Sequence, residues 1–125
     1  MQLNARQLRG QQNYLSGVSG ENAVQRIYED RGCRPLTQRW RGGGGELDLV
    51  FEDDQGLVFV EVKTARRHDL AAQRISPAQV ARIMNAASIF AERYSGGVLV
   101  DMRFDVALVN GKGEVHILEN ALLAT

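Results

Sequence analysis

The sequence predicts an α/β domain with a mixed central sheet of about five strands flanked by helices. Two segments repeat apolar residues at helical spacing, and β-prone runs lie before and after the second of them. The predicted order is helix, three strands, helix, two strands. Strands mixed with helices that can cover both faces of a sheet favour this architecture. The 125 residues suffice for one core but not for two, so we expect residues 19–125 to form a single domain.

The first helix begins at Ser19-Gly20-Glu21 and ends at Gly32, with Val24 and Tyr28 on one apolar stripe. Glu21 lies on the same stripe, near the end of the helix where the macrodipole favours an acid. Glu21 therefore either faces the sheet, where it could join a site, or caps the first turn.

The segment from Cys33 to Arg41 is predicted to be an irregular first strand, followed by a flexible loop of four glycines, Gly42 to Gly45. A phosphate-binding loop of the Walker type would need a Lys-Ser/Thr pair and a following helix. Both are missing after Gly45, so the sequence does not favour a nucleotide site of that type. The loop is expected to be a mobile turn, and close approach of its backbone to a polyanion is the alternative.

The next two strands are predicted to form a hairpin. Two β-rich runs, Glu46 to Phe51 and Leu57 to Thr64, flank the turn signal Asp53-Asp54-Gln55-Gly56. Centring the hairpin on Asp54 and Gln55 places Asp48 opposite Glu61, and Glu46 opposite Lys63.

Alternation along these strands divides their side chains between two faces. One predicted face is charged and carries Asp48, Glu61 and Lys63. The other is apolar and carries Leu47, Leu49, Phe51, Val58, Val60 and Val62. Two carboxylates opposite one another repel, and a bound cation would remove that conflict. The alternative is that the three charged residues form a solvated strand face.

The second helix has a strong start, with Ser76 as cap, Pro77 in the first turn and Gln79 three residues after the cap. It is predicted to run to about Tyr94 and to end at Ser95-Gly96-Gly97. The apolar stripe that packs on the sheet comprises Val80, Ile83, Met84, Ala87, Phe90, Ala91 and Tyr94.

The last two strands are predicted over Val98 to Val109 and Glu114 to Leu118, joined by a turn at Asn110-Gly111-Lys112-Gly113. Asp101 and Asp105 then share one strand face, with no role fixed by their spacing. His68 and His116 lie far apart and lack metal-ligand spacing.

Composition limits the class of protein. No apolar run approaches the roughly 20 residues of a membrane span, so no membrane partner is expected. Residues 1–18 are polar, lack a secretory signal and are expected to form a flexible lead-in, which indicates a cytoplasmic protein. Cys33 is the only cysteine, which excludes an internal disulfide and a cysteine-rich zinc site.

The formal net charge is zero, so the whole molecule does not attract nucleic acid at long range. Basic residues nevertheless gather in sequence around the acidic pair, and phosphate binding depends on local charge. The candidate nucleic-acid-binding residues are Arg39, Arg41, Arg66, Arg67 and Arg74. A solvated basic loop is the alternative. Trp40 could stack on a base or pack on the domain.

With Gly20-Glu21, Gly45 to Val50, Val58 to Lys63 and Arg103 to Val106, the chain resembles the PD-(D/E)xK nuclease superfamily, and more narrowly the YraN-like family. The resemblance implies a restriction-endonuclease-like three-layer core and a relationship to Holliday-junction resolvases. It also implies roles for individual residues, with Asp48 and Glu61 as metal ligands, Lys63 as the catalytic lysine and Glu21 as an auxiliary acid. Leu47 stands where many members have proline.

The resemblance adds Gln79 to the residues expected to contact nucleic acid, because relatives often carry a basic or amide residue at that place. Carboxylate oxygens suit Mg²⁺ or Mn²⁺. We therefore expect a metal-dependent nuclease acting on DNA, including branched or structured DNA in repair or recombination. The alternative is a nucleic-acid-binding or scaffold protein with little turnover. Zero net charge favours assistance from a homodimer or a protein partner.

Overall fold

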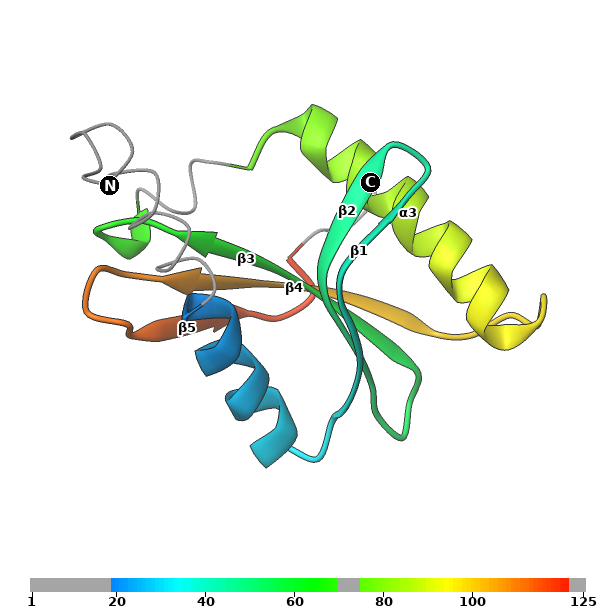
Figure 1. The fold of residues 1–125 in the computed structure, drawn as a ribbon, viewed down its shortest axis with the longest axis horizontal. Helices are drawn as coiled ribbons and strands as arrows, with labels where there is room; N and C mark the ends of the chain where they lie inside the picture. The colour runs from blue at the N-terminus through cyan, green and yellow to red at the C-terminus, as the bar shows by residue number, and fades with distance from the viewer. Residues whose placement is uncertain (1–18, 70–74, 122–125) are drawn as a thin grey trace, which may run out of the picture.

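The computed structural model describes residues 19–69 and 75–121 of the chain. A helix over residues 19–30 precedes the elements labelled in Figure 1, which are β1 (Arg34–Gly42), β2 (Gly45–Glu52), β3 (Leu57–Thr64), α3 (Pro77–Ser95), β4 (Met102–Val109) and β5 (Val115–Leu118). The predicted order of helix, three strands, helix and two strands is confirmed. The proposed lead-in over residues 1–18 lies outside the described residues.

The five strands form one sheet in the order β1-β2-β3-β4-β5. Pairing is antiparallel except between β3 and β4, which run parallel over Leu57 to Thr64. A parallel pair needs a crossover connection, and α3 lies within it. The helix over residues 19–30 and α3 lie on opposite sides of the sheet (Figure 1). The result is the three-layer α/β arrangement that the sequence predicted.

The helix over residues 19–30 packs through the predicted stripe. Val24 and Tyr28 are fully buried, and the Tyr28 ring stacks on Phe51 with ring centroids 4.8 Å apart. Gly32 ends the helix with φ of 87°, and the Cys33 N–H bonds the Tyr28 carbonyl oxygen at 3.0 Å. A left-handed glycine is a common helix terminator because it lacks a Cβ.

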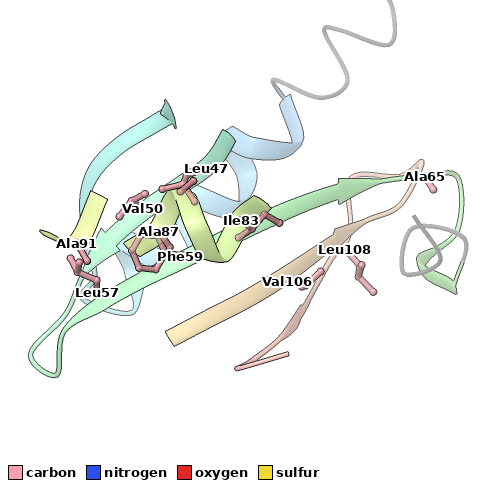
Figure 2. Packing of buried hydrophobic residues seen from close by; sticks show 11 residues of the cluster. Leu47, Val50, Leu57, Phe59, Ala65, Ile83, Ala87, Ala91, Val106 and Leu108 are labelled. Atoms are coloured by element: carbon pink, nitrogen blue, oxygen red, sulfur yellow. The ribbon is translucent and has the colours of Figure 1, made fainter. Parts of the chain in front are cut away.

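Helix α3 has the predicted ends. The Ser76 hydroxyl accepts a hydrogen bond from the Gln79 N–H at 3.1 Å, and Gly96 adopts a left-handed φ of 67°. Its buried face packs on β2 and β3, as Figure 2 shows for Ile83, Ala87 and Ala91 beside Leu47, Val50 and Phe59. Tyr94 is the exception to the predicted stripe because it is 42% exposed.

The β2–β3 hairpin has the predicted register, with Leu49 opposite Val60 and Glu52 opposite Leu57. The hydrogen-bonded ladder stops at Leu49, however, so Asp48 and Glu61 stand beyond its last pair. The prediction that Leu47 shares a face with Leu49 is wrong. Leu47 belongs to the cluster under α3, whereas Leu49 packs against the helix over residues 19–30. The strand twists where it leaves β3, which brings Leu47 onto the α3 side.

The predicted flexible glycine loop is instead a tight hairpin turn. Gly42 pairs with Gly45, and the two residues between them, Gly43 and Gly44, have φ of 60° and 79°. Positive φ at both central positions is the signature of a type I′ turn, which matches the twist of paired strands. The turn lies against α3, where Asn85 Nδ2 donates a hydrogen bond to the Gly43 oxygen at 2.8 Å (Figure 1).

Gly45 sets how closely the hairpin approaches α3. A Cβ at this position would overlap the carbonyl group of Arg82, and a helix backbone cannot yield as a side chain can. We expect Gly45→Ala to lower the free energy of unfolding by roughly 1–3 kcal/mol, the usual cost of overpacking. Urea denaturation measures the effect. Gly44→Ala is the control. It adds a Cβ to the same turn with nothing within 4 Å, so its cost comes from the positive φ of Gly44 and not from overlap. A smaller loss for Gly45→Ala than for Gly44→Ala would contradict this account.

Strand β4 begins later than the sequence predicted. Residues 98–101 are not in the strand, and Val98 and Leu99 are 69% and 98% exposed. Asp101 therefore does not share a strand face with Asp105. Instead, Asp105 is fully buried and accepts hydrogen bonds from the Tyr28 hydroxyl at 2.5 Å and from Arg103. Burial raises the pKa of Tyr28, so its hydroxyl remains a donor. Asp105 ties the first helix to the sheet.

No helix within residues 19–69 and 75–121 combines the length and apolar character needed to cross a membrane.

Candidate active site

A cavity of about 800 Å³ opens where β2 separates from β3. Its walls come from the helix over residues 19–30, the β1–β2 turn, the end of β3 and the first turns of α3. The charged and amide residues that line it are Glu21, Arg41, Glu46, Asp48, Glu61, Lys63, Gln79 and Arg82. All four residues predicted to be catalytic therefore line the same cavity.

Asp48 occupies a place where both neighbouring ladders are interrupted. On the β1 side, Gln38 pairs with Leu49 and Trp40 with Leu47, but Arg39 between them has a positive φ of 50°. On the β3 side the ladder has already ended. The Asp48 side chain replaces the missing backbone hydrogen bond there, because its Oδ2 accepts a hydrogen bond from the Val62 N–H at 2.8 Å. One carboxylate oxygen thus fixes Asp48 to β3.

Glu61 is buried, with only 6% of the residue exposed. Its Oε1 accepts a hydrogen bond from Gln79 Nε2 at 2.9 Å and lies 3.2 Å from Lys63 Nζ. Both contacts fall on the same oxygen, and the Asp48 carboxyl group, which lines the same cavity, acts electrostatically on that of Glu61. Gln79 was expected to contact nucleic acid. The structure shows that its amide is bonded to Glu61.

The carboxyl groups of Glu61, which is buried, and of Asp48, which is half-buried, resist ionisation. Burial raises the pKa of Glu61 to about 8, and the negative charge of Asp48 adds to the rise while Lys63 opposes it. Burial also raises the pKa of Asp48, against the lowering effect of the Val62 N–H. The pKa of Glu21 is raised by burial as well, with Arg39 opposing. Two neighbouring carboxyl groups with raised pKa values share a proton, because both cannot be charged at once. A bound cation could take the place of that proton.

In metal-free buffer, we expect the free energy of unfolding to fall as the pH rises from about 4.5 to about 8. Folded Glu61 keeps its proton up to a pKa of about 8, whereas its ordinary pKa is 4.5. Between these values the folded state binds more protons than the unfolded state, so a higher pH favours unfolding. Urea denaturation in EDTA across this range measures the slope. Glu61→Gln should flatten it, and equal slopes for parent and variant would show that Glu61 is not its source.

The donor set fits a hard divalent cation. Asp48 and Glu61 supply carboxylate oxygens, and Mg²⁺ typically takes one or two protein carboxylates and keeps several waters. Within residues 19–69 and 75–121, no three His, Cys, Asp or Glu side chains group closely enough to hold a metal jointly. Asp48 and Glu61 are thus the residues that would hold a cation here, with water completing its coordination, and the expected Mg²⁺ or Mn²⁺ stays a prediction.

Glu21 faces the cavity, the first of the two positions that the sequence allowed. Its Oε2 lies 3.0 Å from Arg39 Nε, so the acid from the first helix is tied to β1. The side chain of Glu21 is 14% exposed. Its place on the wall agrees with an auxiliary role, which stays a prediction.

The predicted basic residues separate into two groups. Arg41 lines the cavity and forms an ion pair with Glu46 at 3.1 Å, and Arg39 lies beside Glu21. Arg66 and Arg67 do not line it, and Arg67 makes two hydrogen bonds to Asp69. Arg74 lies outside the described residues, so its predicted role has no structural account.

The structure also places the aromatic residues noted in the sequence. Trp40 packs, with its ring edge-on to Phe90 at 5.4 Å between centroids, so the packing alternative is confirmed. His68 and His116, which are far apart in the sequence, lie close in space, with ring centroids 6.0 Å apart. The helical turn that contains His68 folds back beside β5 after β3 ends.

Arg82 is a cavity residue that the sequence reasoning missed. A signal was present, because Arg82 follows Gln79 by three residues on α3, and residues at that spacing share a helix face. Once Gln79 had been assigned to the site, helical geometry alone would have added Arg82.

Comparison with known proteins gives consistent matches. A family model described as "Uncharacterised protein family UPF0102" matches residues 20–109. A UPF0102 protein of Roseobacter denitrificans is 49% identical over 121 residues, covering 97% of this chain and 94% of the relative. One of Dinoroseobacter shibae is 46% identical over 116 residues, covering 93% and 87%. One of Cereibacter sphaeroides is 47% identical over 116 residues, covering 92% and 98%. The stretch matched by the family model contains the whole lining of the cavity.

Proposed function

The chain belongs to the UPF0102 family, and we propose that its activity is divalent-metal-dependent hydrolysis of phosphodiester bonds in DNA. One observation carries the proposal. The buried carboxyl group of Glu61 and the half-buried carboxyl group of Asp48 line one cavity and act on each other electrostatically, with the Lys63 ammonium 3.2 Å from Glu61. The resemblance to PD-(D/E)xK nucleases, which place the same residue types on a β-hairpin, supports it.

A purely structural role gives no reason for this arrangement. Burying two carboxyl groups against each other costs stability, since desolvation and mutual repulsion both disfavour their charged forms. The chain places Asp48 just beyond the last pair of the β2–β3 ladder, beside the part of β3 that bears Glu61. Perturbed titratable groups in a cavity are typical of functional sites.

Each residue has a role in the proposed reaction. Asp48 and Glu61 would hold the cation, while Gln79 fixes the orientation of Glu61. Bound Mg²⁺ would polarise a phosphoryl oxygen and lower the pKa of water. Lys63, whose Nζ lies 3.2 Å from Glu61 Oε1, would orient the attacking water. It would also stabilise the negative charge that develops on the phosphate.

A second candidate is a nucleic-acid-binding or scaffold protein with little turnover. The formal net charge of zero favours it, because a neutral protein lacks the long-range attraction to phosphates that speeds capture of nucleic acid. In that case a homodimer or a protein partner would supply the missing positive surface.

Cleavage assays decide between these candidates. Linear, flapped and four-way DNA substrates are incubated with purified protein in Mg²⁺, Mn²⁺ or EDTA. We expect strand breaks that require the metal and disappear with Asp48→Asn. Binding without metal-dependent breaks on any substrate would refute the nuclease proposal and support the scaffold. Light scattering with and without DNA would show whether a dimer forms.

A further inference from the structure

Arg82 is a cation without a partner on the wall of an acidic cavity. The residue is exposed, and its side chain makes no hydrogen bond or ion pair with any residue that the structure describes. The other lining cations are engaged, Lys63 with Glu61 and Arg41 with Glu46. A guanidinium carries five donors in a planar fork that matches phosphate oxygens. Arg82 is therefore available to an anion from outside the chain.

The position of Arg82 relative to Arg41 is fixed by the backbone. Arg41 precedes the glycine turn, and Gly45 after the turn packs so closely on the Arg82 carbonyl group that a Cβ would not fit. Asn85, three residues after Arg82, holds the same turn through the Gly43 oxygen. The hairpin and α3 thus present one arginine each to the same cavity.

The lining offers little with which to read bases. It contains no aromatic ring among the described residues, so no stacking surface is present. Its one amide side chain, Gln79, is bonded to Glu61. Three of its residues are glycines, Gly42, Gly44 and Gly45, which present only backbone. Sequence is read through base edges, whereas phosphate contacts carry no base information.

We propose that Arg82 and Arg41 hold the phosphates that flank the scissile phosphate, and that the cavity recognises the sugar-phosphate backbone of a strand without reading its bases. This inference rests on the proposed nuclease function and names its substrate class and binding residues. The carboxyl groups and Lys63 act on the central phosphate. The two arginines set the path of the strand on either side.

The test measures binding of a labelled single-stranded oligothymidine and of an abasic strand of equal length, by fluorescence anisotropy in Mn²⁺. Lys63→Ala serves as the background to prevent turnover. We expect both strands to bind within about twofold of each other. Adding Arg82→Ala should weaken both about tenfold and reduce the salt slope by about 0.7, the value for one phosphate of a single strand. Arg41→Ala should act in the same way.

Arg93→Ala is the matched control. Arg93 lies on α3 about 16 Å further along the helix axis and does not line the cavity, so its loss should leave affinity and salt slope unchanged. The proposal would be overturned if Arg82→Ala left the affinity for both strands unchanged. It would also be overturned if the protein with Arg82 intact bound the abasic strand ten times more weakly than the oligothymidine. Because Arg82 is exposed, its removal should alter the melting temperature little, which separates binding from folding.

Failure of this inference is distinguishable from failure of the nuclease proposal. Mn²⁺ affinity, measured by calorimetry, should be the same for Arg82→Ala and the parent. Suppose that Arg82→Ala binds DNA like the parent, whereas Lys63→Ala loses cleavage. The nuclease proposal is then supported, and the proposal that Arg82 and Arg41 hold the flanking phosphates is wrong. If neither the parent nor any variant cleaves DNA but Arg82→Ala loses DNA binding, the proposed phosphate binding by the arginines is supported and the nuclease proposal is wrong.

Discussion

Replacing Lys63 by alanine should reduce cleavage by about 10²–10³-fold, the usual cost of removing one donor that acts on developing charge. Lys63 contacts Glu61 but is not a metal ligand in the proposed site. Its contribution should therefore arise mainly in the transition state, with Mn²⁺ and DNA still bound by the variant. Single-turnover cleavage and Mn²⁺ calorimetry on the same preparation measure the two effects.

The control for Lys63→Ala is the chain's other lysine. Lys112 lies in the turn between β4 and β5, is exposed and does not line the cavity. Lys112→Ala should cleave like the parent. Equal rates for parent and Lys63→Ala would exclude the catalytic role, and a parallel loss of Mn²⁺ binding would make Lys63 a residue of the metal site instead.

Replacing Asp48 by asparagine should lower Mn²⁺ affinity by about 100-fold or more, above the range seen when groups around a ligand are removed. Stability should stay unchanged or rise, because a neutral amide no longer repels Glu61 and its oxygen can still accept the Val62 N–H. Calorimetry and thermal melting in EDTA measure these opposite responses.

Asp54→Asn is the control for Asp48→Asn, because Asp54 is exposed in the β2–β3 turn. Asp54→Asn removes the same charge from the chain and should change neither the Mn²⁺ affinity nor the melting temperature. A large fall in the melting temperature of Asp48→Asn would indicate a structural role. Parent-like Mn²⁺ affinity would remove Asp48 from the site.

Local signals predicted the fold well where one residue type decides the geometry. Ser76 with Gln79 marks a helix start because the hydroxyl satisfies a free N–H, and Gly32 marks an end because it tolerates positive φ. The turn at Asp53 and Gly56 set the hairpin register, and the observed pairs Leu49–Val60 and Glu52–Leu57 follow it.

Long-range packing decided what the sequence did not predict. Strict alternation put Leu47 with Leu49, but beyond the end of the β2–β3 ladder Leu47 packs with the residues of α3 on the other side of the sheet. Four glycines in a row suggested mobility, yet they form one turn that Asn85 bonds through the Gly43 oxygen and that packs closely on the Arg82 carbonyl group. Neither partner lies near the glycines in sequence. For the same reason the approach of His68 to His116 was not foreseen.

In the candidate site, too, local patterns predicted some residues and long-range packing decided the others. The pairing rule brought Asp48 and Glu61 together, and helical spacing put Glu21 on the correct side of its helix. The bond between Gln79 and Glu61 depends on the crossover that lays α3 over β3, which no local pattern encodes. Arg82 was missed for that reason.

The mixed pairing of β3 also has a kinetic consequence. Its first half, Leu57 to Val60, pairs with β2, but Glu61 to Thr64 pair only with β4, which follows α3 in the chain. Pairing across so long a connection carries a loop-closure cost and is a slow step in folding. Until β4 arrives, the segment that bears Glu61 and Lys63 has no ladder to hold it, and its carboxylate remains hydrated and ionised. The acidic pair is therefore completed, with uptake of a proton by Glu61, only when β4 pairs with β3, so that the candidate site forms after the β2–β3 hairpin rather than with it.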